Sequence, residues 1–114
     1  MITFPKGREI YIRPGATDMR KAVNGLSLLI QERMEMNSLS GNYYIFCNRR
    51  RNLMKILYYD KNGYSLWYKR LEEHRFPWPD DESSARKLTK EEAVWLLKGI
   101  DFFNAHKELK YKTV

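Results

Sequence analysis

The fold is decided by residues 43–71, which have the sequence YYIFCNRRRNLMKILYYDKNGYSLWYKRL. The first run, Tyr43 to Asn48, is almost entirely apolar, which is typical of a central strand covered on both faces. Leu53 to Asp60 and Tyr64 to Leu71 alternate between apolar and polar residues, as strands do. The links between these runs are short, and the Asn-Gly pair in the second link favours a tight hairpin. We therefore predict an antiparallel meander whose two hairpin tips lie at opposite ends.

The segment before this stretch has the pattern of a strand followed by a helix. Residues 9–13 alternate and are β-branched, which predicts a strand that ends at Pro14-Gly15. Apolar residues between 22 and 34 follow the spacing of one helical face. Thr17 or Asp18 is expected to cap this helix, because both side chains can accept hydrogen bonds from free amides of a first turn.

The segment after this stretch predicts a second helix. Residues 85–88 are expected to add a short edge strand, and Thr89 and Glu92 have the spacing of a capping box. The apolar face of the helix that follows is predicted to consist of Ala93, Leu96, Leu97 and Ile100, with Gly99 at its end. The order β-α-β-β-β-(β)-α predicts a single α+β domain over residues 1–114, with a mainly antiparallel sheet and helices packed on it. Residues 102–114 are expected to form a flexible basic tail.

Length and composition are those of one compact domain. The chain has 114 residues, and 43% of them are hydrophobic, enough for a core and too many for a disordered chain. Cys47 is the single cysteine, and its place in an apolar run predicts an inert, packed thiol. No run has the pattern of a signal peptide or approaches the ~18 apolar residues that would span a bilayer. These features predict a cytoplasmic protein.

The positive charge is concentrated in the predicted meander. Residues 1–37 carry six basic and four acidic side chains, residues 38–79 carry eight and three, and residues 80–114 carry seven and seven. A basic patch attracts polyanions through a term that weakens with salt. The alternative interpretation is a basic surface that serves only solubility.

Catalytic and metal-binding constellations are absent from the sequence. His74, His106 and Cys47 show none of the usual zinc spacings, and there is no Gly-x-Ser-x-Gly elbow or Walker-type loop. We therefore expect no metal, no cofactor and no enzymatic activity. A metal-dependent nuclease is a minor alternative, because such enzymes gather carboxylates around Mg²⁺. The candidate carboxylates are Asp18, Asp60, Glu72, Glu92 and Asp101.

Three adjacent arginines occupy the first link of the meander, in the run Asn48-Arg49-Arg50-Arg51-Asn52. Neighbouring guanidiniums repel one another, and an anion among them relieves that repulsion. The planar fork of arginine matches a phosphate, so the run predicts a nucleic-acid interface. The predicted nucleic-acid-binding residues are Arg49, Arg50, Arg51, Lys55, Lys69, Arg70, Arg20 and Lys21, the last two placed in the first turn of the helix. Interleaved rings at Tyr59, Trp67 and Tyr68 would either stack on bases or belong to the core.

A series of short motifs runs through most of the chain. The motifs are TDMRK at 17–21, NGL at 24–26, LSG at 39–41, Phe46 and NRRRN at 48–52 with Lys55, Asp60, Gly63, Trp67, KRLE at 69–72, Phe76 with Trp78-Pro79, and LLKGID at 96–101. In their order and spacing, the chain resembles the TnpB-type accessory protein, the second-reading-frame product of insertion sequence 66 elements. This family is distinct from the RNA-guided nucleases that share the name TnpB.

The resemblance implies a role in DNA transposition beside a separate, larger transposase, and it brings no assigned catalytic residues. Together with the arginine run, it leads us to expect a protein that binds DNA at element ends through a basic sheet and hairpin surface. The alternative is a protein-interaction adaptor that docks on the transposase without contacting DNA. Phe76 and Trp78 are the predicted partner-binding anchors of that adaptor, because aromatic residues are frequent at binding hot spots.

Overall fold

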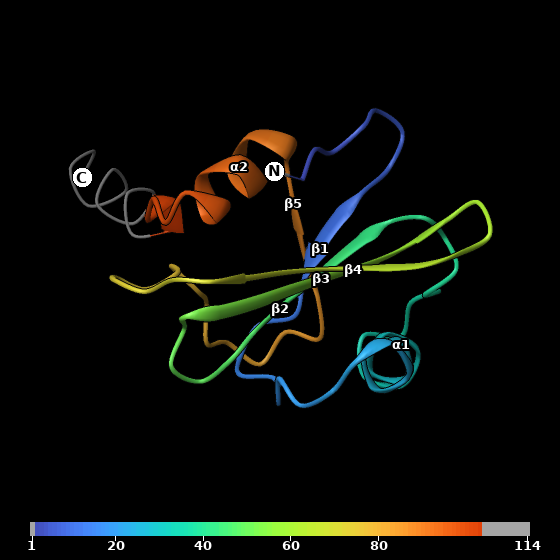
Figure 1. The fold of residues 1–114 in the computed structure, drawn as a ribbon, viewed down its shortest axis with the longest axis horizontal. Helices are drawn as coiled ribbons and strands as arrows, with labels where there is room; N and C mark the ends of the chain where they lie inside the picture. The colour runs from blue at the N-terminus through green and yellow to red at the C-terminus, as the bar shows by residue number, and fades with distance from the viewer. Residues whose placement is uncertain (1, 104–114) are drawn as a thin grey trace.

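The structure is a computed structural model that describes residues 2–103, and a five-stranded sheet forms its centre (Figure 1). The strands are ordered β4-β3-β2-β1-β5 across the sheet. Along the chain, the elements are β1 (Ile10–Ile12), α1 (Val23–Glu32), β2 (Tyr43–Cys47), β3 (Leu53–Asp60), β4 (Gly63–Arg70), β5 (Arg86–Leu88) and α2 (Lys90–Leu97).

Most strand pairings in the sheet are antiparallel. β2 pairs with β3, β3 with β4, and β1 with β5 in this sense, whereas β1 and β2 are parallel. The parallel pair arises because the chain returns from β1 to β2 through α1, a crossover that lets both strands run the same way. The predicted α+β domain with a mainly antiparallel sheet is confirmed, and the β1–β2 pair is the one parallel pairing among the described strands.

The two helices lie on opposite faces of the sheet (Figure 1). On one face, Phe46 of β2 packs with Leu26 and Ile30 of α1. On the other face, Ile45 of β2 belongs to the core cluster that contains Leu96 of α2. Full burial of a side chain of this size contributes about 1.5–3 kcal/mol. Burial on both faces explains the unbroken apolar run of β2, as the sequence predicted.

The start of α1 differs from the sequence prediction. Its N-cap is Ala22, with no side-chain capping bond, so the predicted cap at Thr17 or Asp18 is wrong. Thr17 is buried, and Asp18 Oδ1 instead accepts a hydrogen bond from the amide of Arg20 (2.9 Å). This bond closes a turn before the helix, so Arg20 and Lys21 precede α1 and do not lie in its first turn.

The capping box of α2 is confirmed. Thr89 Oγ1 accepts from the Glu92 amide (3.1 Å), and Glu92 Oε1 accepts from the Thr89 amide (2.9 Å). Gly99 follows the helix with a φ of 76°, a left-handed conformation that glycine adopts freely. Because the chain turns there, Ile100 leaves the helical face and is 48% exposed, so its predicted place on the apolar face is wrong.

The core extends into the segment predicted to be a tail. Phe102 is 4% exposed, and its ring centroid lies 6.0 Å from that of Trp95 and 4.1 Å from that of Phe103. The remainder of the predicted tail, residues 104–114, lies outside the described residues.

The two hairpin tips of the meander lie at opposite ends of its long strands (Figure 1). β3 and β4 are joined at one end, where Asp60 pairs with Gly63. β2 and β3 are joined at the other end by residues 48–52, hereafter the arginine turn. This confirms the predicted meander and places the three arginines at one end of the sheet.

Candidate nucleic-acid interface

Two flanking asparagines shape the arginine turn. Asn48 Oδ1 accepts hydrogen bonds from the amides of Asn52 (3.0 Å) and Leu53 (3.1 Å), and its Nδ2 donates to Asn52 Oδ1 (2.8 Å). Arg51 has a φ of 61°, in the left-handed region that residues with a side chain seldom adopt. The Asn48 side chain thus satisfies backbone amides within the turn, and Arg49 and Arg50 stand exposed at its tip.

Replacing Asn48 by alanine removes an acceptor from two backbone amides of the turn. We expect the free energy of unfolding to fall by about 1–3 kcal/mol, because part-buried amides lose their partner. Urea denaturation followed by tryptophan fluorescence measures this change. Asn48→Asp is the control, because it keeps the acceptor oxygen for both amides and loses only the Nδ2 donor to Asn52, and it should cost less than Asn48→Ala. An equal loss in both variants would contradict the assigned role of Oδ1.

The loop after β4 docks on the arginine turn and brings a fourth guanidinium to it. The amide of Phe76 donates to the carbonyl of Arg51 (2.7 Å), and the amide of Leu71 donates to the carbonyl of Asn52 (2.8 Å). Arg75 Nη1 also donates to the carbonyl of Arg50. Sequence reasoning missed Arg75, because it lies 25 residues from Arg50 and joins the turn only through this long-range docking.

Within residues 2–103, no carboxylate is paired with a guanidinium of the arginine turn. The ion pairs in this part of the chain are Arg8–Asp60, Arg20–Asp18, Arg70–Glu72 and Lys87–Glu9. Arg49, Arg50 and Arg51 therefore have no ion-pair partner among the described residues. Three adjacent positive charges without ion-pair partners at one tip produce a local positive potential that favours a polyanion.

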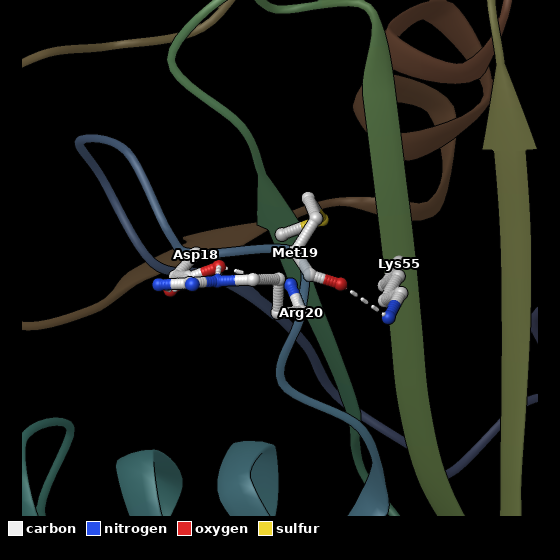
Figure 2. Close-up of polar contacts among 4 residues, drawn as sticks. All are labelled: Asp18, Met19, Arg20 and Lys55. Carbon is white, nitrogen blue, oxygen red and sulfur yellow. Dashed lines mark hydrogen bonds and ion pairs between the residues drawn. The ribbon is translucent and has the colours of Figure 1, made fainter.

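Lys55 of β3 is a structural anchor for the segment before α1 (Figure 2). Its Nζ donates to the carbonyls of Met19 (2.7 Å) and Lys21 (2.8 Å). The amide of Thr17 donates to the carbonyl of Cys47 at the end of β2 (2.8 Å). These bonds hold residues 17–21 along the end of the sheet that carries the arginine turn. The ammonium group of Lys55, which was predicted to bind phosphate, is therefore already engaged with the backbone.

Arg20 is exposed and folded back on Asp18 (Figure 2). Its Nε lies 3.0 Å from both carboxylate oxygens, and its Nη2 donates to Oδ2 (2.7 Å). Hydrogen bonds from Arg20 lower the pKa of Asp18 to about 2. An exposed ion pair contributes little to stability, so a phosphate can compete with Asp18 for this guanidinium. Lys21 is exposed beside it.

Lys69 and Arg70 of β4 are also engaged within the fold. Lys69 Nζ donates to the carbonyl of Leu97 (3.1 Å), the last residue of α2, where a cation offsets the helix dipole. Arg70 Nε donates to Glu72 Oε1 (2.8 Å), and this pairing raises the pKa of Arg70. Arg70 pairs in register with Leu53, which follows the arginine turn. Arg70 therefore lies at the basic end, while Lys69 points toward α2.

The structure does not bring the predicted basic residues onto one face of the sheet, because α1 and α2 cover opposite faces. Most of the predicted cations that are not held inside the fold instead lie at the end of the sheet around the arginine turn, hereafter the basic end. Its members are the exposed Arg49, Arg50, Arg75, Arg20 and Lys21, the half-buried Arg51, and Arg70, which is exposed but paired. Of the three rings considered for base stacking, Tyr68 is 51% exposed, whereas Trp67 and Tyr59 are partly buried.

Phe76 and Trp78, the predicted partner-binding anchors, lie in the core of the domain. They are 1% and 6% exposed, and Trp78 Nε1 donates to the carbonyl of Gly15 (2.9 Å). Both rings are anchors of the fold, because they hold the loop after β4 against the sheet. In this folded state they present almost no surface to a partner.

The carboxylates considered for a nuclease are distributed over the molecule. Asp18, Asp60 and Glu72 are each paired with an arginine, Glu92 completes the capping box of α2, and Asp101 follows that helix. Within residues 2–103, no three His, Cys, Asp or Glu residues are grouped so that they could hold a metal ion. His106 lies outside the described residues. No helix in the described part of the chain has the length and apolarity needed to cross a bilayer.

Burial raises the pKa of the Cys47 thiol to about 12, and the nearby charge of Arg51 only partly offsets this effect. The folded protein thus keeps the thiol protonated at pH 8, whereas the unfolded chain ionises it readily. We expect a disulfide reagent to modify native Cys47 at least about 100-fold more slowly than the unfolded chain. Rapid modification of the native protein would contradict this burial.

Because only the unfolded state loses the thiol proton between pH 9 and pH 11, ionisation of Cys47 lowers the stability of the folded protein in this range.

Comparisons with known proteins identify relatives that match most of the chain. The sequence model of the family described as "IS66 Orf2 like protein" matches residues 8–107. The chain is 37% identical over 101 residues to the uncharacterised protein y4hO of Sinorhizobium fredii, which covers 87% of this chain and 88% of that protein. It is 28% identical over 102 residues to the uncharacterised protein y4jC of the same organism, covering 90% and 87%. No solved structure matches the chain.

Proposed function

The chain belongs to the IS66 Orf2-like family of insertion-sequence accessory proteins, and from this premise we propose that it takes part in transposition by binding DNA through its basic end. The observation that carries the proposal is the arginine turn. Arg49, Arg50 and Arg51 stand at a hairpin tip without a carboxylate partner in residues 2–103, and Arg75 is fixed beside them. The expected target is DNA at the element ends, and the expected partner is the transposase of the same element.

The proposed role is non-enzymatic. Arginine forks at the tip bind phosphate oxygens, and Arg20 and Lys21 extend the contact along the same end of the sheet. Phosphate contacts position a protein on DNA without reading its sequence. The basic end alone would therefore give weak sequence preference, and selection of the element ends would require the transposase or a feature of DNA structure.

The test is a salt titration of DNA binding by fluorescence anisotropy with a labelled duplex. If the four guanidiniums around the arginine turn each neutralise one phosphate, the logarithm of the association constant should fall with the logarithm of salt concentration with a slope of about −3.6. A slope near zero, or no binding at 50 mM salt, would overturn the proposal. The adaptor alternative has less support, because Phe76 and Trp78 are buried.

A further inference from the structure

A polar hollow of about 440 Å³ opens on one side of the arginine turn. Arg49 and Arg51 line it from the turn, while Arg50 lines a different hollow with Arg75. Asp80 lines the hollow as well, so two cations and one anion share a single space. The volume is within the range of pockets that hold small molecules, about 300–1,000 Å³.

The wall that carries Asp80 is fixed by hydrogen bonds. The amide of Gly15 donates to the carbonyl of Pro79 (3.0 Å), and Trp78 Nε1 donates back to the carbonyl of Gly15 (2.9 Å). Asp80 follows Pro79 directly, and its Oδ1 would stand 3.9 Å from a Cβ atom added at Gly15. The carboxylate thus lies over a residue without a side chain, at the edge of an open space.

Arg49 and Arg51 carry a charge opposite to that of Asp80 around the same hollow. Here neither Arg49 nor Arg51 forms an ion pair with Asp80, and within residues 2–103 Asp80 has no ion pair or hydrogen-bond partner for its carboxylate. The separation leaves room for a ligand that carries a negative group at one end and N–H donors at the other. A nucleotide whose base carries N–H donors has this arrangement, because its phosphate and its base lie at opposite ends of the sugar.

We propose that this hollow binds an unpaired guanine nucleotide of DNA, with the phosphate on Arg49 and Arg51 and the base on Asp80. The inference rests on the proposed DNA binding and specifies what the basic end recognises. Guanine is the base whose Watson–Crick edge offers two adjacent donors, N1–H and N2–H, which a carboxylate accepts with both oxygens. Enzymes that flip a nucleotide out of the duplex read this edge of the base inside a pocket. Single-stranded ends or flaps would therefore be the preferred substrate.

The experiment compares duplexes that differ only in one unpaired terminal nucleotide: guanine, hypoxanthine or thymine. Hypoxanthine keeps N1–H and lacks the amino group, so it isolates one of the two donors. For the wild-type protein, we expect the guanine overhang to bind about fivefold or more tightly than either of the others, as for other paired base contacts. Asp80→Asn should remove this preference and leave the salt dependence of binding in place.

Asp81→Asn is the matched control, because it makes the same change of charge at the next residue. The Asp81 carboxylate accepts from the Ser83 amide (2.9 Å) and lines another hollow, so this variant should keep the preference for guanine. Equal binding of the three overhangs, or a preference that survives in Asp80→Asn, would overturn the pocket while leaving the proposed DNA binding intact. Failure to bind any of the duplexes at low salt would overturn both.

Discussion

Replacing Arg49, Arg50 and Arg51 together by alanine should weaken DNA binding by about three orders of magnitude near 50 mM salt and make the salt slope shallower by about 2.7. The reason is counterion release: each lost phosphate contact makes the slope shallower by about 0.9. A phosphate contact contributes more to affinity at low salt, because the release of counterions is then more favourable. Near 1 M salt, the variant and the wild type should bind almost equally. Anisotropy titrations at four or more salt concentrations measure both quantities.

The control for this variant removes three positive charges from the opposite end of the sheet. Lys6, Lys61 and Lys90 are exposed, and Lys61 lies at the hairpin tip remote from the arginine turn. Their triple alanine variant has the same net charge as the arginine variant and should retain most of the affinity. If both triple variants lost equal affinity, binding would depend on overall charge, and the assignment of a site at the basic end would be wrong.

The local features of this fold were predictable from the sequence because their causes lie within a few residues. The apolar run of β2 is buried on both sides, the Asn-Gly tip closes a hairpin, and Thr89 and Glu92 form the capping box. In each case, the residues within a few positions are enough to predict the local structure. The resemblance to the insertion sequence 66 family agrees with the family match, because ordered motifs through most of a chain are more specific than any one of them.

The prediction of the site was less complete because it depended on contacts between distant segments. Lys55 donates hydrogen bonds to the carbonyls of Met19 and Lys21. Lys69 donates to the carbonyl of Leu97. The sequence showed that these strand residues are charged, but it could not show which distant groups they contact. The contact of Arg75 with the arginine turn likewise joins segments that are far apart in the sequence. The sequence therefore singled out the arginine turn as a candidate, whereas the contacts around it, at an end of the sheet and not on its face, could not be predicted from the sequence.

The largest change in stability is expected for Trp78→Ala. The ring is 6% exposed in the cluster that contains Phe76 and Leu97, and it donates a hydrogen bond from Nε1 to Gly15. Its removal leaves a cavity and an unpaired carbonyl, so the free energy of unfolding should fall by about 3–5 kcal/mol. For a small domain, which is typically stable by only about 5–15 kcal/mol, such a loss approaches unfolding.

Trp78→Phe separates the two contributions, because it keeps an aromatic ring and loses only the donor and some volume. It should cost about 1–2 kcal/mol, and both variants can be compared by urea denaturation followed by circular dichroism. An unchanged denaturation midpoint for Trp78→Ala would contradict the buried position of this ring. The same pair of variants determines how a pull-down on the transposase is interpreted. Suppose that Trp78→Ala abolishes capture of the transposase while the folded Trp78→Phe variant retains it. The loss is then caused by unfolding of the domain, because a buried indole does not contact a partner directly.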